Sequence, residues 1–125
     1  MQIKSCITLF AFVAGISAFQ CPQKISKQIL SKIEFDYTTI DQDGLDRGDV
    51  AVEYEFCIPQ DDNHFKEVLV IEENTKVMKS SKGRIGCMDQ QWLCMVSTHH
   101  PQWQERLYAI ASLSYVDKII RTYYE

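Results

Sequence analysis

Three histidines are the residues best able to act as acids, bases or metal ligands: His64, His99 and His100. A secreted ribonuclease-like hydrolase would combine a histidine acid with a carboxylate base and a cation that binds phosphate. The chain offers candidates for these roles in His64 or His99, Glu53 or Glu55, and Arg84 or Arg106. The histidines have no third ligand at a diagnostic spacing, so they predict no metal site. We therefore assign no catalytic residue, metal or cofactor, and keep the hydrolase as an alternative function.

The acidic segment 41–49 suggests a calcium loop. If Thr39 held the first position of an EF-hand, Asp41 and Asp43 would hold the third and fifth. The first position then lacks its carboxylate, and the twelfth is Val50 in place of the bidentate glutamate. The segment therefore predicts a solvated acidic turn.

Of the five cysteines, Cys6 lies in a hydrophobic N-terminal segment and four remain: Cys21, Cys57, Cys87 and Cys94. An even number in an exported chain is typical of a disulfide framework, and four cysteines allow three pairings. We favour Cys21–Cys57 and Cys87–Cys94, with no thiol left free. The first pair would tie the mature N-terminus to the clearest strand, and the second would close a short loop.

Four residues form the one concentration of basic side chains in a chain of net charge -4: Lys76, Lys79, Lys82 and Arg84. An acidic chain is poorly suited to a phosphate backbone, so nucleic acid is not the expected partner. The cluster is either a solvated hairpin edge that discourages strand addition or a patch that binds an acidic protein or an anionic surface. We take it as the candidate binding site. Candidate aromatic anchors, most of them expected in the core, are Trp92, Trp103, Tyr108, Tyr115, Tyr123 and Tyr124.

The clearest element that could position these residues is a strand over residues 50–58. Its apolar set is Val50, Val52, Tyr54, Phe56 and Ile58. Its other set is Ala51, Glu53, Glu55 and Cys57. Strict alternation predicts a half-buried antiparallel strand with Glu53 and Glu55 facing away from the core, and Pro59 should end it.

The remaining pattern is also mostly β, apart from one short amphipathic helix predicted near the mature N-terminus over residues 23–32. Residues 106–116 fit both a helical and an alternating period, and we favour a strand because the segments from residue 50 onward indicate β structure. The fold class is mostly β (α+β): a compact antiparallel β sandwich or barrel-like domain with a short N-terminal helix. Further β segments are expected at 33–40, 68–71, 75–79 and within 84–97, with a break at 99–102.

Residues 1–18 have the parts of a secretory signal: a basic start at Lys4, an apolar run over 6–17, and the small residue Ala18. The run is too short to cross a hydrocarbon core of about 30 Å as a helix. We expect cleavage near Ala18 and one secreted, extracellular domain over residues 19–125 without a membrane span.

In format the chain resembles the small secreted effector proteins of plant-pathogenic fungi. It shares their signal peptide, opening Met1-Gln2, a mature domain near a hundred residues, a cysteine just behind the cleavage site at Cys21, and an even cysteine count. The resemblance implies a virulence effector that binds a host protein without catalysis. It also allows translocation of the secreted effector into the host. It assigns no site residue. An extracellular carrier of a small apolar ligand shares the same format and is a further alternative.

Overall fold

In the computed structural model, which describes residues 25–123, the longest strands are β3 and β5. The helices are α2 (Lys27–Leu30), α3 (Asp62–Ile71) and α4 (Trp103–Ala111). The strands are β1 (Leu45–Asp46), β2 (Val50–Ala51), β3 (Glu53–Pro59), β4 (Lys76–Met78), β5 (Gln91–Ser97) and β6 (Ile120–Thr122).

Four strands form one antiparallel sheet in the order β4-β5-β3-β6, and β1 and β2 form a separate two-stranded ribbon. α3 connects β3 to β4, and α4 connects β5 to β6, so each helix joins two parallel strands with a third strand between them. This β-α-β-β-α-β order is the split β-α-β arrangement of ferredoxin-like domains. The predicted antiparallel, β-rich α+β character is confirmed, whereas the sandwich or closed barrel is not.

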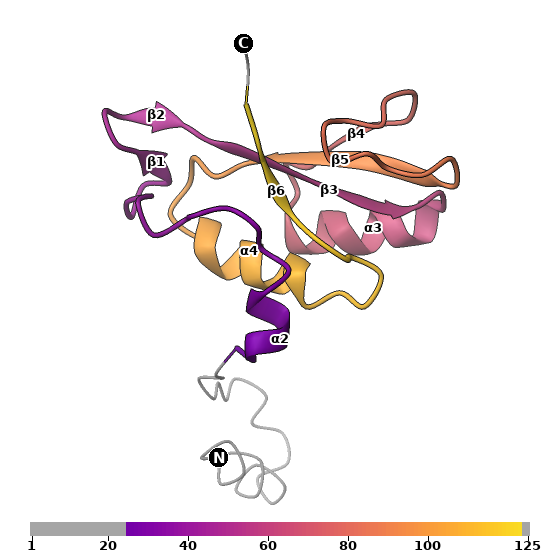
Figure 1. The fold of residues 1–125 in the computed structure, drawn as a ribbon, viewed down its shortest axis with the longest axis horizontal. Coiled ribbons are helices and arrows are strands. Elements are labelled where there is room, and N and C mark those ends of the chain that lie inside the picture. The colour runs from indigo at the N-terminus through magenta and orange to yellow at the C-terminus, as the bar shows by residue number, and fades with distance from the viewer. Residues whose placement is uncertain (1–24, 124–125) are drawn as a thin grey trace, which may run out of the picture.

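Helices α3 and α4 lie against the same face of the sheet, which we call the inner face (Figure 1). The strand residues that point there are the apolar set of the predicted strand from Val52 onward, together with Cys94 and Val96 of β5. Val68, Leu107 and Ile110 of the helices pack against them and are fully buried. The alternation of residues 52–58 therefore correctly identifies the core face, and Pro59 is the last residue of β3, as predicted. The prediction is wrong for Val50, which is 48% exposed and lies on β2, outside the sheet that contains β3.

The predicted strand over residues 68–71 is wrong, because the segment is the end of helix α3. Asp61 caps this helix: its side chain accepts a hydrogen bond from the Asn63 N–H at 3.0 Å. Val68 is fully buried, yet Val70 is 86% exposed, so the segment has one buried stripe and not two buried faces. Capping and burial thus outweigh the β-branched composition of the run.

The favoured strand over residues 106–116 is also wrong, because α4 covers the first half of this segment. Leu107 and Ile110, three positions apart, are both buried against the sheet, as the helical period requires. The alternation of apolar residues in the same segment therefore does not correspond to a strand.

The N-terminal elements are shorter than predicted. Residues 23 and 24 lie outside the described part of the chain, and within 25–32 only the single turn α2 forms, so the predicted amphipathic helix is not confirmed. The extended segment predicted over 33–40 is reduced to one bridge, between Ile33 and Ile119. The Asp36 side chain accepts a hydrogen bond from the Thr38 N–H, which turns the chain there.

The acidic segment forms the turn that leads into β1. The Asp41 carboxylate accepts hydrogen bonds from the N–H groups of Asp43 and Leu45, at 2.9 and 3.0 Å. Thr98 donates its hydroxyl to the Gly44 carbonyl at 2.7 Å and fixes the turn to the end of β5. Within residues 25–123, no group of three or more His, Cys, Asp and Glu side chains is placed to hold a metal ion. No helix in this range has the length and apolar character needed to cross a membrane.

Candidate functional site

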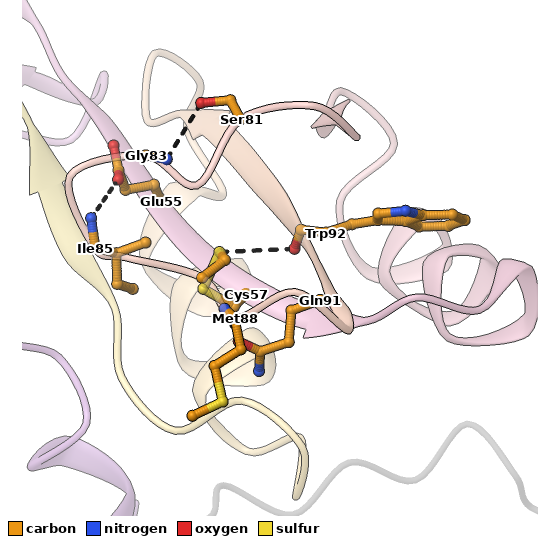
Figure 2. The surroundings of a disulfide bond; sticks show 9 residues. Glu55, Cys57, Ser81, Gly83, Ile85, Met88, Gln91 and Trp92 are labelled. Atoms are coloured by element: carbon orange, nitrogen blue, oxygen red, sulfur yellow. Dashed lines mark hydrogen bonds between the residues drawn. A yellow bond between two sulfur atoms is a disulfide. The ribbon is translucent and has the colours of Figure 1, made fainter.

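The connection between β4 and β5, residues 79–90, is twelve residues long, whereas hairpin loops usually have two to five. We call it the outer loop, because it folds back over the outer face of the sheet, opposite α3 and α4 (Figures 1 and 2). There Ile85 and Cys87 pack against Leu93 to form a small second core. The loop is therefore a fixed part of the surface.

A disulfide between Cys57 and Cys87 ties the outer loop to β3, with the Cα atoms 5.6 Å apart (Figure 2). This finding corrects both favoured pairs, Cys21–Cys57 and Cys87–Cys94. Cys94 is a buried free thiol, and Cys21 lies outside the described residues. The reason is the pleat of the sheet: Cys57 pairs with Leu93 on the outer face, so the next residue, Cys94, points to the inner face. Burial there raises the pKa of the Cys94 thiol to about 12.

Glu55 is the second anchor of the outer loop. Its carboxylate accepts hydrogen bonds from the Ile85 N–H at 3.0 Å (Figure 2) and from the Thr122 hydroxyl at 2.7 Å. Gly83, at φ +65°, passes so close that an added Cβ would lie 2.6 Å from a Glu55 oxygen. The alternation placed Glu55 on the outer face correctly, but the expectation that this residue faces away into solvent is wrong, because the outer loop buries it.

A recess of about 210 Å³ lies beside the disulfide. Its lining comes from four segments: Cys57 of β3, Ile85, Gly86 and Met88 of the outer loop, Gln91 of β5, and Asp117 and Lys118 ahead of β6. Met88 is 66% exposed and lies at the rim of this recess. Gln91 accepts a hydrogen bond from the Met88 N–H at 2.8 Å and fixes that residue at the rim (Figure 2).

The four predicted binding residues all lie on β4 or the outer loop. Lys76 pairs with Glu53 at 3.4 Å, and Lys82 pairs with Asp89 at 2.9 Å. The Lys79 ammonium lies 4.4 Å from the centre of the Trp92 ring. Arg84 is exposed on the same loop. Lys79 thus lies against Trp92, a residue that packs on the inner core, whereas Lys82 and Arg84 lie farther along the outer loop.

The proposed aromatic anchors are divided between the core and the surface. Trp103, Tyr108 and Tyr115 pack against the inner core. Tyr123 is exposed beside Arg121, whose guanidinium carbon lies 5.0 Å from the centre of its ring. Tyr124 is outside the described residues. Trp92, under Lys79, is the aromatic residue that lies next to the basic cluster.

A second cluster of ionisable groups lies on the inner face, around the fully buried Glu72. One carboxylate oxygen is 2.8 Å from Nε2 of His100, and the other accepts a hydrogen bond from Arg106 at 3.0 Å. Burial raises the pKa of the nearby Tyr54 phenol, and the Glu72 charge raises it further. Sequence reasoning named His100 and Arg106 but missed Glu72, which continues the buried stripe of α3 four positions after Val68.

Two of the residues considered for a hydrolase, His64 and Glu55, have other partners. His64 is 2.7 Å from the Asp61 carboxylate and packs edge-on against Tyr115. Glu55 is committed to the outer loop, and His99 is exposed at the end of β5. The one histidine in a buried network, His100, has its second ring nitrogen, Nδ1, buried without a hydrogen-bond partner among the described residues. No nitrogen of this ring is presented to a substrate.

Comparison of the chain with protein-family models, curated proteins and solved structures gave no match. Since the split β-α-β arrangement serves many unrelated functions, the fold by itself points to none. The functional conclusion therefore rests on the geometry of the outer face.

Proposed function

We propose that the chain is a secreted interaction protein that binds a partner protein through the outer loop, without catalysis. The observation that carries this proposal is the construction of the loop. A hairpin connection needs few residues, yet this one has twelve, held on the sheet by a disulfide and by a buried carboxylate. Long ordered loops on a rigid scaffold are where binding residues concentrate.

The charge of the outer loop favours an acidic partner. The loop has three cations, Lys79, Lys82 and Arg84, and one carboxylate, Asp89, which gives a local charge of +2 in a chain of net charge -4. Opposite potentials across an interface speed association and select the partner. As a virulence effector, the protein would find this partner in the host.

Secretion is part of the proposal and has two supports. The pattern of residues 1–18 is typical of a secretory signal, and a disulfide such as Cys57–Cys87 persists in oxidising compartments. The hydrolase receives no such support, because the His64 ring contacts Asp61 and the Glu55 carboxylate is buried under the outer loop. The carrier would need an enclosed apolar cavity, whereas the recess beside the disulfide has Asp117 and Lys118 in its wall.

The test is charge reversal with a matched control. A partner is first captured from plant host tissue with the purified chain 19–125, and its Kd is then measured at several salt concentrations. We expect the variant Lys79→Glu, Lys82→Glu, Arg84→Glu to bind at least about tenfold more weakly and to lose the salt dependence of binding. The variant Lys27→Glu, Arg47→Glu, Lys66→Glu makes the same change in net charge at exposed positions elsewhere and should bind nearly as well as the wild type.

Equal losses in the two variants would show that only net charge matters and would refute the outer loop as the site. RNA cleavage by the same preparations is the enzymatic control. If the chain cleaves RNA and replacement of His64 and His99 by Gln abolishes this activity, the hydrolase replaces the interaction protein. His100 is left out of that variant because it holds the buried Glu72.

A further inference from the structure

The two neighbours of strand β3 cover different lengths of it. β5 pairs with β3 from Glu53 to Pro59, along its whole length. β6 pairs only from Glu53 to Glu55, where Ile120 is the last partner. Among the described residues, no strand pairs with the end of β3, residues 57–59, on the β6 side.

The direction of the backbone groups follows from the register of β3 and β5. The Val52 carbonyl accepts from the Thr98 N–H, and the Gln60 N–H donates to the Gln90 carbonyl. Even-numbered residues of β3 therefore direct their backbone groups toward β5, and odd-numbered residues direct theirs toward β6. It follows that the N–H and C=O of Cys57 point into the space beyond the end of β6.

That space is the recess beside the disulfide. Cys57 forms part of its lining, and Asp117 and Lys118, which precede β6, form the opposite wall instead of continuing the ladder. Ile85 and Met88 enclose the recess from the outer face (Figure 2). The N–H and C=O of Cys57, which pair with no strand of residues 25–123 on this side, thus lie next to a partly apolar pocket.

We propose that this recess binds an extended segment of the partner protein, which adds to the sheet beside Cys57. This inference rests on the proposed function and names the form of the partner. A residue antiparallel to β3 can exchange two hydrogen bonds with Cys57, and its side chain then lies on the same face as that of Cys57. That face holds Ile85 and Met88, so the side chain enters the pocket. Main-chain bonds give affinity in such strand addition, and pockets give specificity.

The size and charge of the site indicate which peptide sequence it would bind. A volume of about 210 Å³ holds one large aliphatic or aromatic side chain. The residues two positions away on either side point to the same face and meet the outer loop, whose local charge is +2. The preferred segment is therefore extended and acidic, with one apolar residue at its centre.

The first experiment selects a phage-displayed library of random heptapeptides on the folded, oxidised chain 19–125. We expect enriched peptides to contain one central Leu, Ile, Met or Phe, with Asp or Glu two positions away on one or both sides. They should bind Met88→Glu at least about tenfold more weakly, because the new carboxylate repels them at the rim. Met78→Glu places the same change on β4, at another exposed methionine, and should bind like the wild type. Failure to enrich any acidic peptide, or equal binding to both variants, would overturn the proposal.

The second experiment measures hydrogen exchange of the backbone amides of β3. In the free protein the Cys57 amide should exchange with deuterated water faster than those of Phe56 and Ile58, which face β5. The selected peptide should slow exchange at Cys57 by about tenfold or more, as for a newly made ladder bond. A peptide N-methylated at its apolar residue, which keeps the side chain but lacks the donor, should lose this protection. If Cys57 is not protected while the charge-reversed outer loop still loses the captured partner, strand addition is refuted and the proposed function stands.

Discussion

Two buried carboxylates, one on each face of the sheet, hold segments that the strand pairing does not hold. Glu55 receives an N–H from the outer loop and a hydroxyl from β6. Glu72 receives His100 and Arg106, and so joins the end of α3 to α4 and the preceding turn. Each is completely desolvated, and so each depends on the partners that replace water.

Replacing Glu72 by Gln should strongly destabilise the fold. The amide removes the negative charge that pairs with the Arg106 guanidinium, and it replaces one acceptor oxygen of the network by an NH2 group. Breaking a buried ion pair by removing one partner costs about 3–5 kcal/mol, and we expect the lower end because the Arg106 side chain is 30% exposed. Urea unfolding measures the loss. Glu73→Gln, one residue later and exposed, is the control and should change stability by less than about 0.5 kcal/mol. Similar values for the two variants would contradict the network.

The Cys94 thiol should be inert in the folded protein. Burial raises its pKa to about 12, so at pH 8 the reactive thiolate is scarce and shielded. A thiol reagent should react with one more group in the denatured wild type than in the denatured Cys94→Ala variant. In the native state the two proteins should react with the same number of groups. Reaction of Cys94 in the native state at the rate of a free thiol would show that the inner core is open.

At the scale of elements, the β1-β2 ribbon is attached to β6 by Asp46, whose carboxylate accepts from Arg121 at 2.7 Å. A hydrogen bond from the Thr39 side chain and then that from Arg121 lower the pKa of Asp46 to about 2. The folded-state pKa lies below the ordinary value of 3.8, so this attachment stabilises the fold fully above about pH 4 and is lost as the pH falls toward 2.

Asp46→Asn should therefore be less stable than the wild type at neutral pH, and the difference should vanish between about pH 4 and pH 2. Unfolding free energies measured across this range test the prediction. Asp43→Asn, in the same acidic segment and exposed, should follow the wild type. A difference between Asp46→Asn and the wild type that persists unchanged at pH 2 would mean that the charge of Asp46 does not contribute.

The elements differ in how far sequence could predict them. The alternation from Val52 to Ile58 identified β3 and its core face, because a strand with one buried face has apolar residues at every second position. α3 and α4 were missed, because their apolar runs fit two periods and Asp61, the cap that decides for α3, was not weighed. The sequence predicted only residues 79–83 of the outer loop as a loop and a strand within 84–97. The return of the loop across β5 and β3 could not be predicted, because it depends on contacts of Cys87 with Cys57 and of Ile85 with Glu55, which are distant in sequence.

At the scale of the whole molecule, the two faces of the sheet are covered in different ways. Two helices bury the inner face, and their contacts with the strands make the main core. The outer face has only the twelve-residue loop and its small core around Leu93. The candidate site is on that second face. Its position could not be predicted, although the basic residues that mark it were named from their spacing.

The disulfide closes a ring between residues 57 and 87 that contains all of α3 and β4. A cross-link of this span removes conformational entropy worth about 3–4 kcal/mol from the unfolded chain. It also restricts the outer loop before any partner arrives, so less ordering remains to oppose association. The protein is in this sense preorganised. In the reduced protein the helices would still pack on the inner face, and the first property to fail would be the residence time of the complex.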